Sequence, residues 1–219
     1  MSNIAIIDYG MGNLYSVSKA VEHVAESKDN IIVTSDANKI ATSDKVIFPG
    51  QGAAKDCMSA LQHHELQSAI IEAARQKPFL GVCMGMQVLM QMSEENNGTD
   101  CLGVYKGNVK YFGNHLTIGS GENSYKVPHM GWNGIEQQQN HPLWKDIPQS
   151  SYFYFVHSYF VATEEDALIA GTTSYGPVFT SVIARDNVFA MQCHPEKSAQ
   201  SGLQLLKNFI HWDGANTVN

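Results

Sequence analysis

Cys83 is the residue of this chain that is best suited to act as a nucleophile. An apolar run over residues 78–82 precedes it, and a helical pattern over residues 84–90 follows it. Gly81 and Gly85 flank the cysteine, two residues before it and two residues after it. This pattern predicts a strand, a sharp turn and a helix, the arrangement of a nucleophile elbow, with sulfur in place of the usual serine oxygen. The positive end of such a helix favours thiolate over thiol. Taken alone, the segment also fits a buried structural cysteine at a glycine-rich strand end.

A second group of reactive side chains lies near the other end of the chain. Residues 189–193 read as a short apolar strand, and His194, Pro195 and Glu196 follow where that strand should end. A thiolate nucleophile needs a base that takes and returns a proton, and the base needs an orienting partner. The fixed φ of proline restricts how the two side chains are presented. A histidine and a glutamate at this spacing are often only a surface pair, but together with Cys83 they predict a catalytic triad of Cys83, His194 and Glu196.

Size and charge limit the classes to which the protein can belong. The chain has 219 residues, of which 43% are hydrophobic, and a formal net charge of −7. This size predicts a single α/β domain over residues 1–219 with a full core. Proteins that bind nucleic acids are typically basic, so the acidic balance argues against a nucleic-acid partner. Because the N-terminus lacks a basic region and no run approaches the roughly 18 apolar residues of a membrane span, we expect a cytoplasmic protein that does not enter membranes.

Neither the cysteines nor the remaining histidines are spaced like metal ligands. The four cysteines are scattered and form no CxxC pair, which fits reduced thiols better than a disulfide framework. We therefore expect no metal and no cofactor, and treat the histidines outside the motifs as ordinary surface or core residues: His23, His63, His64, His115, His141 and His211.

The order of predicted elements indicates a mostly parallel central sheet flanked by helices, with additional antiparallel strands. Up to about residue 92, strands and helices alternate, which is typical of parallel strands joined by crossover helices. The strands are expected at 4–7, 31–34, 46–48 and 78–82, and the helices at 14–25 and about 58–76. Later strands are expected at 104–112, 135–137, 151–161, 168–172, 178–184 and 188–193, loops at 94–103 and 113–123, and a final helix at 199–211.

Several motifs together resemble a known family. GVCMGMQ (81–87) and CHPEKS (193–198) resemble the class I, or triad, glutamine amidotransferases, whose glutaminase domains release ammonia from glutamine. IIDYGMGN (6–13), FPGQG (48–52), PHMGWN (128–133) and FVHSY (155–159) make the chain similar to the glutaminase subunits of imidazole glycerol phosphate synthase. The resemblance covers residues 3–212.

The resemblance implies a fold, a substrate and a partner. The fold would be the flavodoxin-like α/β fold of class I glutamine amidotransferases, and the substrate L-glutamine, with no cofactor. The partner would be a (β/α)₈-barrel cyclase in a heterodimer. The cyclase uses the ammonia to make imidazole glycerol phosphate and aminoimidazole carboxamide ribotide in histidine biosynthesis. The family's glutaminase is also thought to stay idle until a peptide in its oxyanion segment flips.

The resemblance also implies roles for residues around the triad. Backbone amides near Gly50, Gln51 and Gly52, and that of Met84, would hold the oxyanion, although FPGQG alone could be a plain turn. Gln87 lies about one helical turn after the nucleophile and would recognise the substrate. Glu95 would bind the α-amino group of glutamine, with Glu94 as its solvated neighbour. The remaining substrate contacts would come from His157, Ser158 and Tyr159, which could instead be a core histidine and a strand edge.

PHMGWN is unusual for an exposed loop, because methionine and tryptophan side chains are costly to leave in water. The resemblance implies that it docks the partner, since these residue types are enriched at interface centres; the alternative is a loop folded onto its own core. The implied interface residues are Asn13, Pro128, His129, Met130, Trp132 and Asn133. Cys193 stands where the family commonly has an aromatic residue, and it could be a second oxidisable thiol.

Three other functions remain open at this point. The closest keeps the glutaminase chemistry but supplies ammonia for amidating sugars of surface polysaccharides. A cysteine redox sensor on a similar fold is a second, and a non-catalytic docking subunit is a third; the pairing of cysteine with a His-x-Glu motif argues against both.

Overall fold

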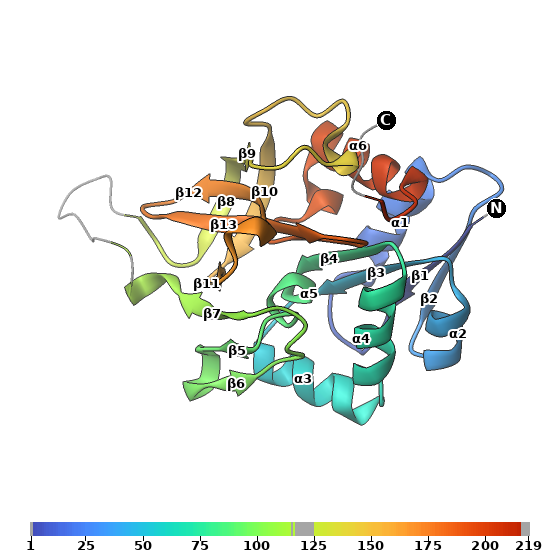
Figure 1. Cartoon of the computed structure of the whole chain (residues 1–219), viewed down its shortest axis with the longest axis horizontal. Helices are drawn as coiled ribbons and strands as arrows, with labels where there is room; N and C mark the ends of the chain where they lie inside the picture. Colours follow the sequence, from blue (N-terminus) through green and yellow to red (C-terminus); the bar gives the residue numbers. More distant parts are fainter. Residues whose placement is uncertain (1, 115, 117–124, 216–219) are drawn as a thin grey trace.

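The computed structural model describes residues 2–114, 116 and 125–215 (Figure 1). Its central strands are buried on both faces, which explains their uninterrupted apolar sequences. Along β1 (Asn3–Ile7), Ile4 and Ile6 pack into one core layer and Ala5 and Ile7 into the other. Successive side chains of a strand point to opposite faces, so one short strand contributes to both layers.

The parallel part of the sheet brings the predicted reactive residues to one edge. Its strands lie in the order β2 (Asn30–Thr34), β1, β3 (Lys45–Gly50), β4 (Phe79–Cys83) and β14 (Val188–Met191). All neighbouring pairs among them are parallel. Gly50 pairs with Cys83, and Met191 pairs with Val82. The carboxyl ends of β3, β4 and β14 therefore meet, and open α/β sheets bind ligands at this edge.

Helices cover both faces of these strands (Figure 1). One face carries α1 (Leu14–Val24) and α6 (Ala199–His211), and the other carries α2 (Ala37–Thr42), α3 (Ala54–His63) and α4 (Gln67–Gln76). The amphipathic spacing of α1 and α6 buries Val17, Val21, Leu205 and Phe209 in the same layer as Ile4. Within the described ranges, no helix is long and apolar enough to cross a membrane.

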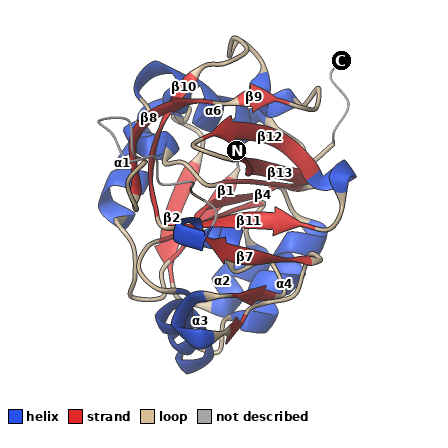
Figure 2. Cartoon of the chain, turned by 90° about the vertical axis from the view of Figure 1, so that its left-hand side faces the viewer, coloured by secondary structure: helices blue, strands red, loops and turns tan. Residues whose placement is uncertain are grey.

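An antiparallel extension continues the sheet beyond β14. It runs through β13 (Val178–Arg185), β11 (Tyr159–Thr163), β7 (Gly107–Tyr111), β5 (Met92–Ser93) and β6 (Thr99–Asp100), of which β5 and β7 are parallel to each other. β12 (Ile169–Ser174) pairs with β13, and β9 (Glu136–Gln137) pairs with β12. β8 (His129–Gly134) and β10 (Tyr152–His157) form a separate antiparallel pair, seen side by side in Figure 2. Short 3₁₀ turns lie at Glu95–Asn97, Phe112–Asn114, Pro142–Trp144, Asp166–Leu168 and Pro195–Lys197.

The predicted α/β class, with its parallel centre and antiparallel additions, is confirmed, but several boundaries were wrong. The helical region at 58–76 is two helices, because Glu65 adopts a positive φ of 56° and breaks the pattern. The expected strand at 151–161 is β10 and β11, which belong to different sheets. PHMGWN is not a loop but largely strand β8, and the expected loop at 94–103 contains a 3₁₀ turn and β6. Helix α2 was not predicted, and the expected loop at 113–123 falls mostly outside the described residues.

Candidate active site

Cys83 occupies a strained turn between β4 and a short helix, α5 (Met84–Gln87). Its φ of 55° and ψ of −108° lie in a region that residues with a side chain rarely adopt. Glycine is required at both flanking positions, because neighbouring atoms lie too close to leave room for a side chain. A Cβ at Gly85 would overlap the Phe48 carbonyl oxygen, and one at Gly81 would lie 2.8 Å from the Gly85 oxygen. The predicted elbow is confirmed, although its α-helix ends at Gln87 and not at residue 90.

His194 and Glu196 follow β14, and the side chains of both are buried. The His194 Nδ1 atom lies 2.9 Å from Glu196 Oε1, and the two side chains are 7% and 2% exposed. The backbone holds the imidazole in place, because the His194 N–H donates to the Tyr154 carbonyl at 2.9 Å and the Ser198 hydroxyl donates to the His194 carbonyl at 2.6 Å. Pro195 begins the 3₁₀ turn that brings Glu196 back onto the ring.

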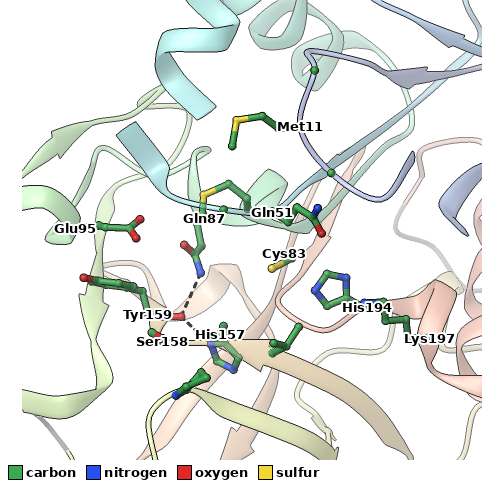
Figure 3. A pocket seen from close by; sticks show the side chains of 16 residues that line it. Met11, Gln51, Cys83, Gln87, Glu95, His157, Ser158, Tyr159, His194 and Lys197 are labelled. Carbon is green, nitrogen blue, oxygen red and sulfur yellow. Dashed lines mark hydrogen bonds between the residues drawn. The ribbon is translucent and has the colours of Figure 1, made fainter. Parts of the chain in front are cut away.

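Two neighbours determine the charge of His194. Burial lowers its pKa, but the negative charge and hydrogen bonding of Cys83 and of Glu196 outweigh burial and raise the pKa above the usual value. The buried Nε2 atom has no nitrogen or oxygen partner among the described residues, so it is the ring atom available to the thiol proton. Figure 3 shows the cysteine beside this ring at the wall of a pocket. An imidazole with a raised pKa next to a cysteine sulfur is the arrangement that activates cysteine nucleophiles.

The pocket has a volume of about 710 Å³ and collects residues from segments far apart in the chain. Besides Cys83 and His194, it is lined by Gly10, Met11, Gly12, Gln51, Gly52, Met84, Gln87, Glu95, Pro128, Val156, His157, Ser158, Tyr159 and Lys197. All five residues predicted to bind glutamine are therefore brought together at one cavity with Cys83 and His194.

The backbone around Gly50 and Met84 is packed closely against the nucleophile. A Cβ at Gly50 would overlap the Tyr9 hydroxyl and lie 2.8 Å from the Met84 Cβ, so only glycine fits at that position. Gln51 and Gly52 are exposed at the pocket, and Gly52 has a φ of +91°. The first N–H groups of a helix lack an intrahelical acceptor, so those of α5 are available to an anionic oxygen beside Cys83.

Gln87 is buried at the inner wall of the pocket with its amide orientation fixed. Its Nε2 donates to the Tyr159 carbonyl at 3.1 Å and to Gln192 Oε1 at 2.9 Å. Both amide hydrogens are thus used within the protein, and a ligand in the pocket would meet the amide oxygen.

Glu95 also lines the pocket and fixes the segment that follows β3. Its Oε2 atom accepts the Ala54 N–H at 2.6 Å, which ties the 3₁₀ turn at Glu95–Asn97 to the start of α3. Its neighbour Glu94 is exposed to solvent, as predicted, and its Oε2 also accepts the Tyr111 N–H at 2.9 Å.

The His157 imidazole is neutral, and both of its ring nitrogens lie within hydrogen-bond distance of a partner. Its Nδ1 lies 2.7 Å from the Tyr159 carbonyl and its Nε2 lies 2.9 Å from His129 Nδ1. Burial lowers the pKa of His157 to about 3 and that of His129 to about 4. His157 lines the pocket together with Ser158 and Tyr159, but as a neutral side chain it cannot offer a cation to a carboxylate at neutral pH.

The residues predicted to dock a partner divide into exposed and buried ones. The side chains of Met130 and Trp132 are 61% and 50% exposed. His129 is 3% exposed and stacks between Phe155 and Tyr175, so its side chain offers no docking surface. The two remaining polar members make internal bonds: Asn133 donates to the Ser174 carbonyl at 2.9 Å, and Asn13 accepts the Ser16 N–H at the start of α1.

Sequence reasoning missed Gln192, Tyr9 and Lys197. The Gln192 amide donates to Cys83 Sγ at 3.5 Å; the available signal was a polar residue inside the apolar run at 189–193. The Tyr9 hydroxyl occupies the space that a Cβ at Gly50 would need. Lys197, within CHPEKS, lines the pocket. Cys193 is completely buried, and burial raises its pKa well above the usual value, so it is not a reactive second thiol. In the described part of the chain, no group of three or more His, Cys, Asp or Glu residues could hold a metal ion.

Comparison with known proteins agrees with this geometry. Residues 5–212 match the model of the family "Glutamine amidotransferase class-I". The chain is 55% identical to "Imidazole glycerol phosphate synthase subunit HisH" of Hydrogenovibrio crunogenus, covering 96% of this chain and 97% of that protein. It is 50% identical to the protein of the same name from Pseudomonas putida, with 98% and 99% covered. The fold is similar to that of a crystallised glutamine amidotransferase, with a TM-score of 0.67 at 13% identity over 94% of this chain and 97% of that one. The chain belongs to the class I glutamine amidotransferase family, and within it to the relatives named imidazole glycerol phosphate synthase subunit HisH.

Proposed function

We propose that this chain is the glutaminase subunit of an imidazole glycerol phosphate synthase, hydrolysing L-glutamine to glutamate and ammonia. The observation that carries the proposal is Cys83 on its strained elbow, facing the buried His194–Glu196 pair at the wall of one pocket. The names of relatives that are about half identical over nearly the whole chain support the same function.

The proposed reaction begins with attack of the Cys83 sulfur on the side-chain amide carbon of glutamine. His194 takes the thiol proton and passes it to the amide nitrogen as the carbon–nitrogen bond breaks, releasing ammonia and leaving a thioester. Glu196 orients the imidazole and stabilises its charged form. Water, deprotonated by His194, then attacks the thioester, so that glutamate leaves and the thiol is restored.

The residues that line the pocket support an assignment of the other groups of glutamine to individual binding residues. Backbone amides at Gly50–Gly52 and Met84 would stabilise the oxyanion, each contributing about 3 kcal/mol to the transition state. We assign the α-amino group of glutamine to Glu95, because this carboxylate lines the pocket and carries the opposite charge. Ser158 and Tyr159 would hold the α-carboxylate, and the Gln87 amide oxygen would accept a hydrogen bond from the substrate.

We propose a (β/α)₈-barrel cyclase as the partner. Ammonia released into water is protonated and loses its nucleophilicity, so glutaminase chemistry calls for a sheltered path to the enzyme that uses it. Met130 and Trp132 are exposed, and Trp132 packs against Tyr154, whose ring contacts the pocket residue Lys197; this supports a docking face there. The cyclase would convert the ammonia and its ribotide substrate to imidazole glycerol phosphate and aminoimidazole carboxamide ribotide. The free cysteines of the chain support a reducing, cytoplasmic site of action.

Replacing Cys83 with alanine tests this function. In a complex with the cyclase, Cys83→Ala should abolish glutamine-dependent synthesis while ammonium salts still support it, because the cyclase chemistry does not use the thiol. Cys101→Ala, which removes a thiol outside the pocket lining, is the matched control and should retain both activities. Glutamine-dependent turnover in Cys83→Ala would refute the proposal. A wild-type chain that hydrolyses glutamine but does not bind this cyclase would instead indicate the paralogue that amidates surface-polysaccharide sugars.

A further inference from the structure

Gln192 is a buried polar side chain directly behind the nucleophile. It follows β14, is 0% exposed, and is anchored through its backbone N–H to the Ser181 carbonyl at 2.8 Å. A buried amide among apolar neighbours is costly unless its hydrogen bonds are satisfied. Its side chain does not line the pocket, so a substrate held there would not displace it.

A directional chain of hydrogen bonds decides which end of the Gln192 amide faces the sulfur. The Tyr159 carbonyl can only accept, so Gln87 must present its Nε2 to it. The same Nε2 donates to Gln192 Oε1 at 2.9 Å. Gln192 therefore turns its own Nε2 toward Cys83 Sγ, at 3.5 Å.

This donor acts on the sulfur in two ways. The elbow fixes the backbone of Cys83, but the direction of the Cβ–Sγ bond, set by rotation about Cα–Cβ, depends on what the sulfur contacts. An amide N–H on one side and the imidazole of His194 near it leave the sulfur little freedom to rotate. A donor also binds a thiolate more strongly than a thiol, because hydrogen bonds to charged groups are the stronger ones.

We propose that Gln192 is a positioning residue that holds the Cys83 sulfur in its attacking orientation and stabilises its thiolate. The effect on the sulfur stands on geometry alone. Its consequence for glutamine hydrolysis rests on the proposed function.

The test measures how the rate of Cys83 alkylation by iodoacetamide depends on pH, with the modified peptide quantified by mass spectrometry. Gln192→Glu has the same shape but places a negative charge beside the sulfur, and Gln192→Met removes the donor. At neutral pH we expect alkylation to slow about tenfold in Gln192→Glu and about threefold in Gln192→Met, with the midpoint of the profile moved to higher pH. Gln62→Glu, an exposed site on α3, is the matched control and should leave the profile unchanged.

The other titratable groups that face the sulfur or the pocket are the same in every variant. They are Tyr9 from the loop after β1, His157 from β10, Tyr159 from β11, Cys193 and His194 after β14, Glu196 beside the imidazole, and Glu95 and Lys197 at the pocket wall. A moved midpoint is therefore assigned to position 192. Circular dichroism checks that each variant is folded, and Gln192→Met carries the test if the buried carboxylate prevents folding.

A profile that stays unchanged in folded Gln192→Met would overturn the inference, because a residue that only fills space is replaced by methionine without effect on the sulfur. The proposed function would survive that result. Steady-state rates provide the second readout: a lower kcat with little change in KM is expected, since Gln192 does not touch the pocket. A wild-type chain that never hydrolyses glutamine would refute the proposed function but leave the alkylation result standing.

Discussion

The chemistry at Cys83 depends on close contacts that tolerate few side chains. The residue has a positive φ, Gly50 pairs with it from β3, and a Cβ at Gly85 would overlap the Phe48 carbonyl oxygen. Strain of this kind costs of order 1–3 kcal/mol and persists only where the surrounding structure enforces it. Here it aims the sulfur at the pocket and at His194.

At the residue scale, the two partners of the thiol should differ in importance. His194→Ala removes the proton carrier and should reduce glutaminase kcat nearly as far as loss of the thiol does. Glu196→Gln keeps a hydrogen-bonding side chain beside Nδ1 and should leave more residual activity, because an orienting group usually contributes less than the base. Steady-state glutamate release in the complex measures both, and full activity in both variants would limit His194 and Glu196 to a structural role.

Much of the site could be predicted from the sequence, because its residues occur in short motifs. The glycines around Cys83 and the order of His194 and Glu196 after a strand carry their own physical reasons. Gln192 could not be assigned from the sequence, since its role depends on Gln87 and on a carbonyl that comes from β11. The neutral state of His157 likewise could not be predicted from the sequence, because it follows from burial by residues that are distant along the chain.

At the element scale, the pair of β8 and β10 has an inner and an outer face. His129 stands opposite His157 and Trp132 stands opposite Tyr154. The histidines are buried among aromatic rings, while the tryptophan is half exposed. From the sequence, residues 128–133 are expected to form a loop, because the segment is short and contains a glycine. In the structure most of them form β8, because pairing with β10 stabilises a strand that the local sequence favours only weakly.

The buried histidine pair predicts loss of stability in acid. The folded protein keeps His129 and His157 neutral, with pKa values lowered to about 4 and about 3, whereas the unfolded chain protonates them below about pH 6.5. Their contribution is therefore complete above that pH and is lost as the pH falls toward the lowered values. Each histidine should cost about 1.4 kcal/mol of unfolding free energy per pH unit in this window.

Urea unfolding of a His129→Phe/His157→Phe double variant at several pH values checks this. The variant should show a flatter dependence of stability on pH between about 6.5 and 4 than wild type, whatever its absolute stability. His63→Phe, an exposed position, is the control and should keep the wild-type slope. His194 contributes with the opposite sign, since its raised pKa favours the folded state at low pH, and it is present in every variant. Equal slopes in wild type and the double variant would contradict the account.

At the scale of the whole molecule, the pocket lies where the loop before α1, the ends of β3 and β4, and the start of β8 converge. A partner on the outer face of β8 and β10 would therefore sit beside the active site. A ligand on that partner can activate the glutaminase only by favouring the active arrangement of the oxyanion segment over the idle one.

Trp132→Ala should weaken binding of the cyclase about tenfold or more, since a half-exposed tryptophan is a typical centre of binding energy. It should also reduce the rise in glutamate release that the loaded cyclase produces, while leaving the thermal transition of the free chain unchanged. Titration of the cyclase, followed by glutamate release, measures both effects. Val33→Ala, exposed on the far edge strand β2, is the matched control; equal effects of the two substitutions would place the docking surface elsewhere.

Labelling of the intact complex with a chloromethyl ketone derived from glutamine tests directly whether Cys83 is the nucleophile of a glutamine-binding pocket. The four free cysteines provide internal controls, because Cys83 alone among them lines the pocket. Peptide mapping should find the label on Cys83, with protection by excess L-glutamine, no label on Cys57, Cys101 or Cys193, and none in Cys83→Ala. Label that spreads to Cys101, or that glutamine does not prevent, would contradict the assignment of Cys83 as the nucleophile of a glutamine-binding pocket.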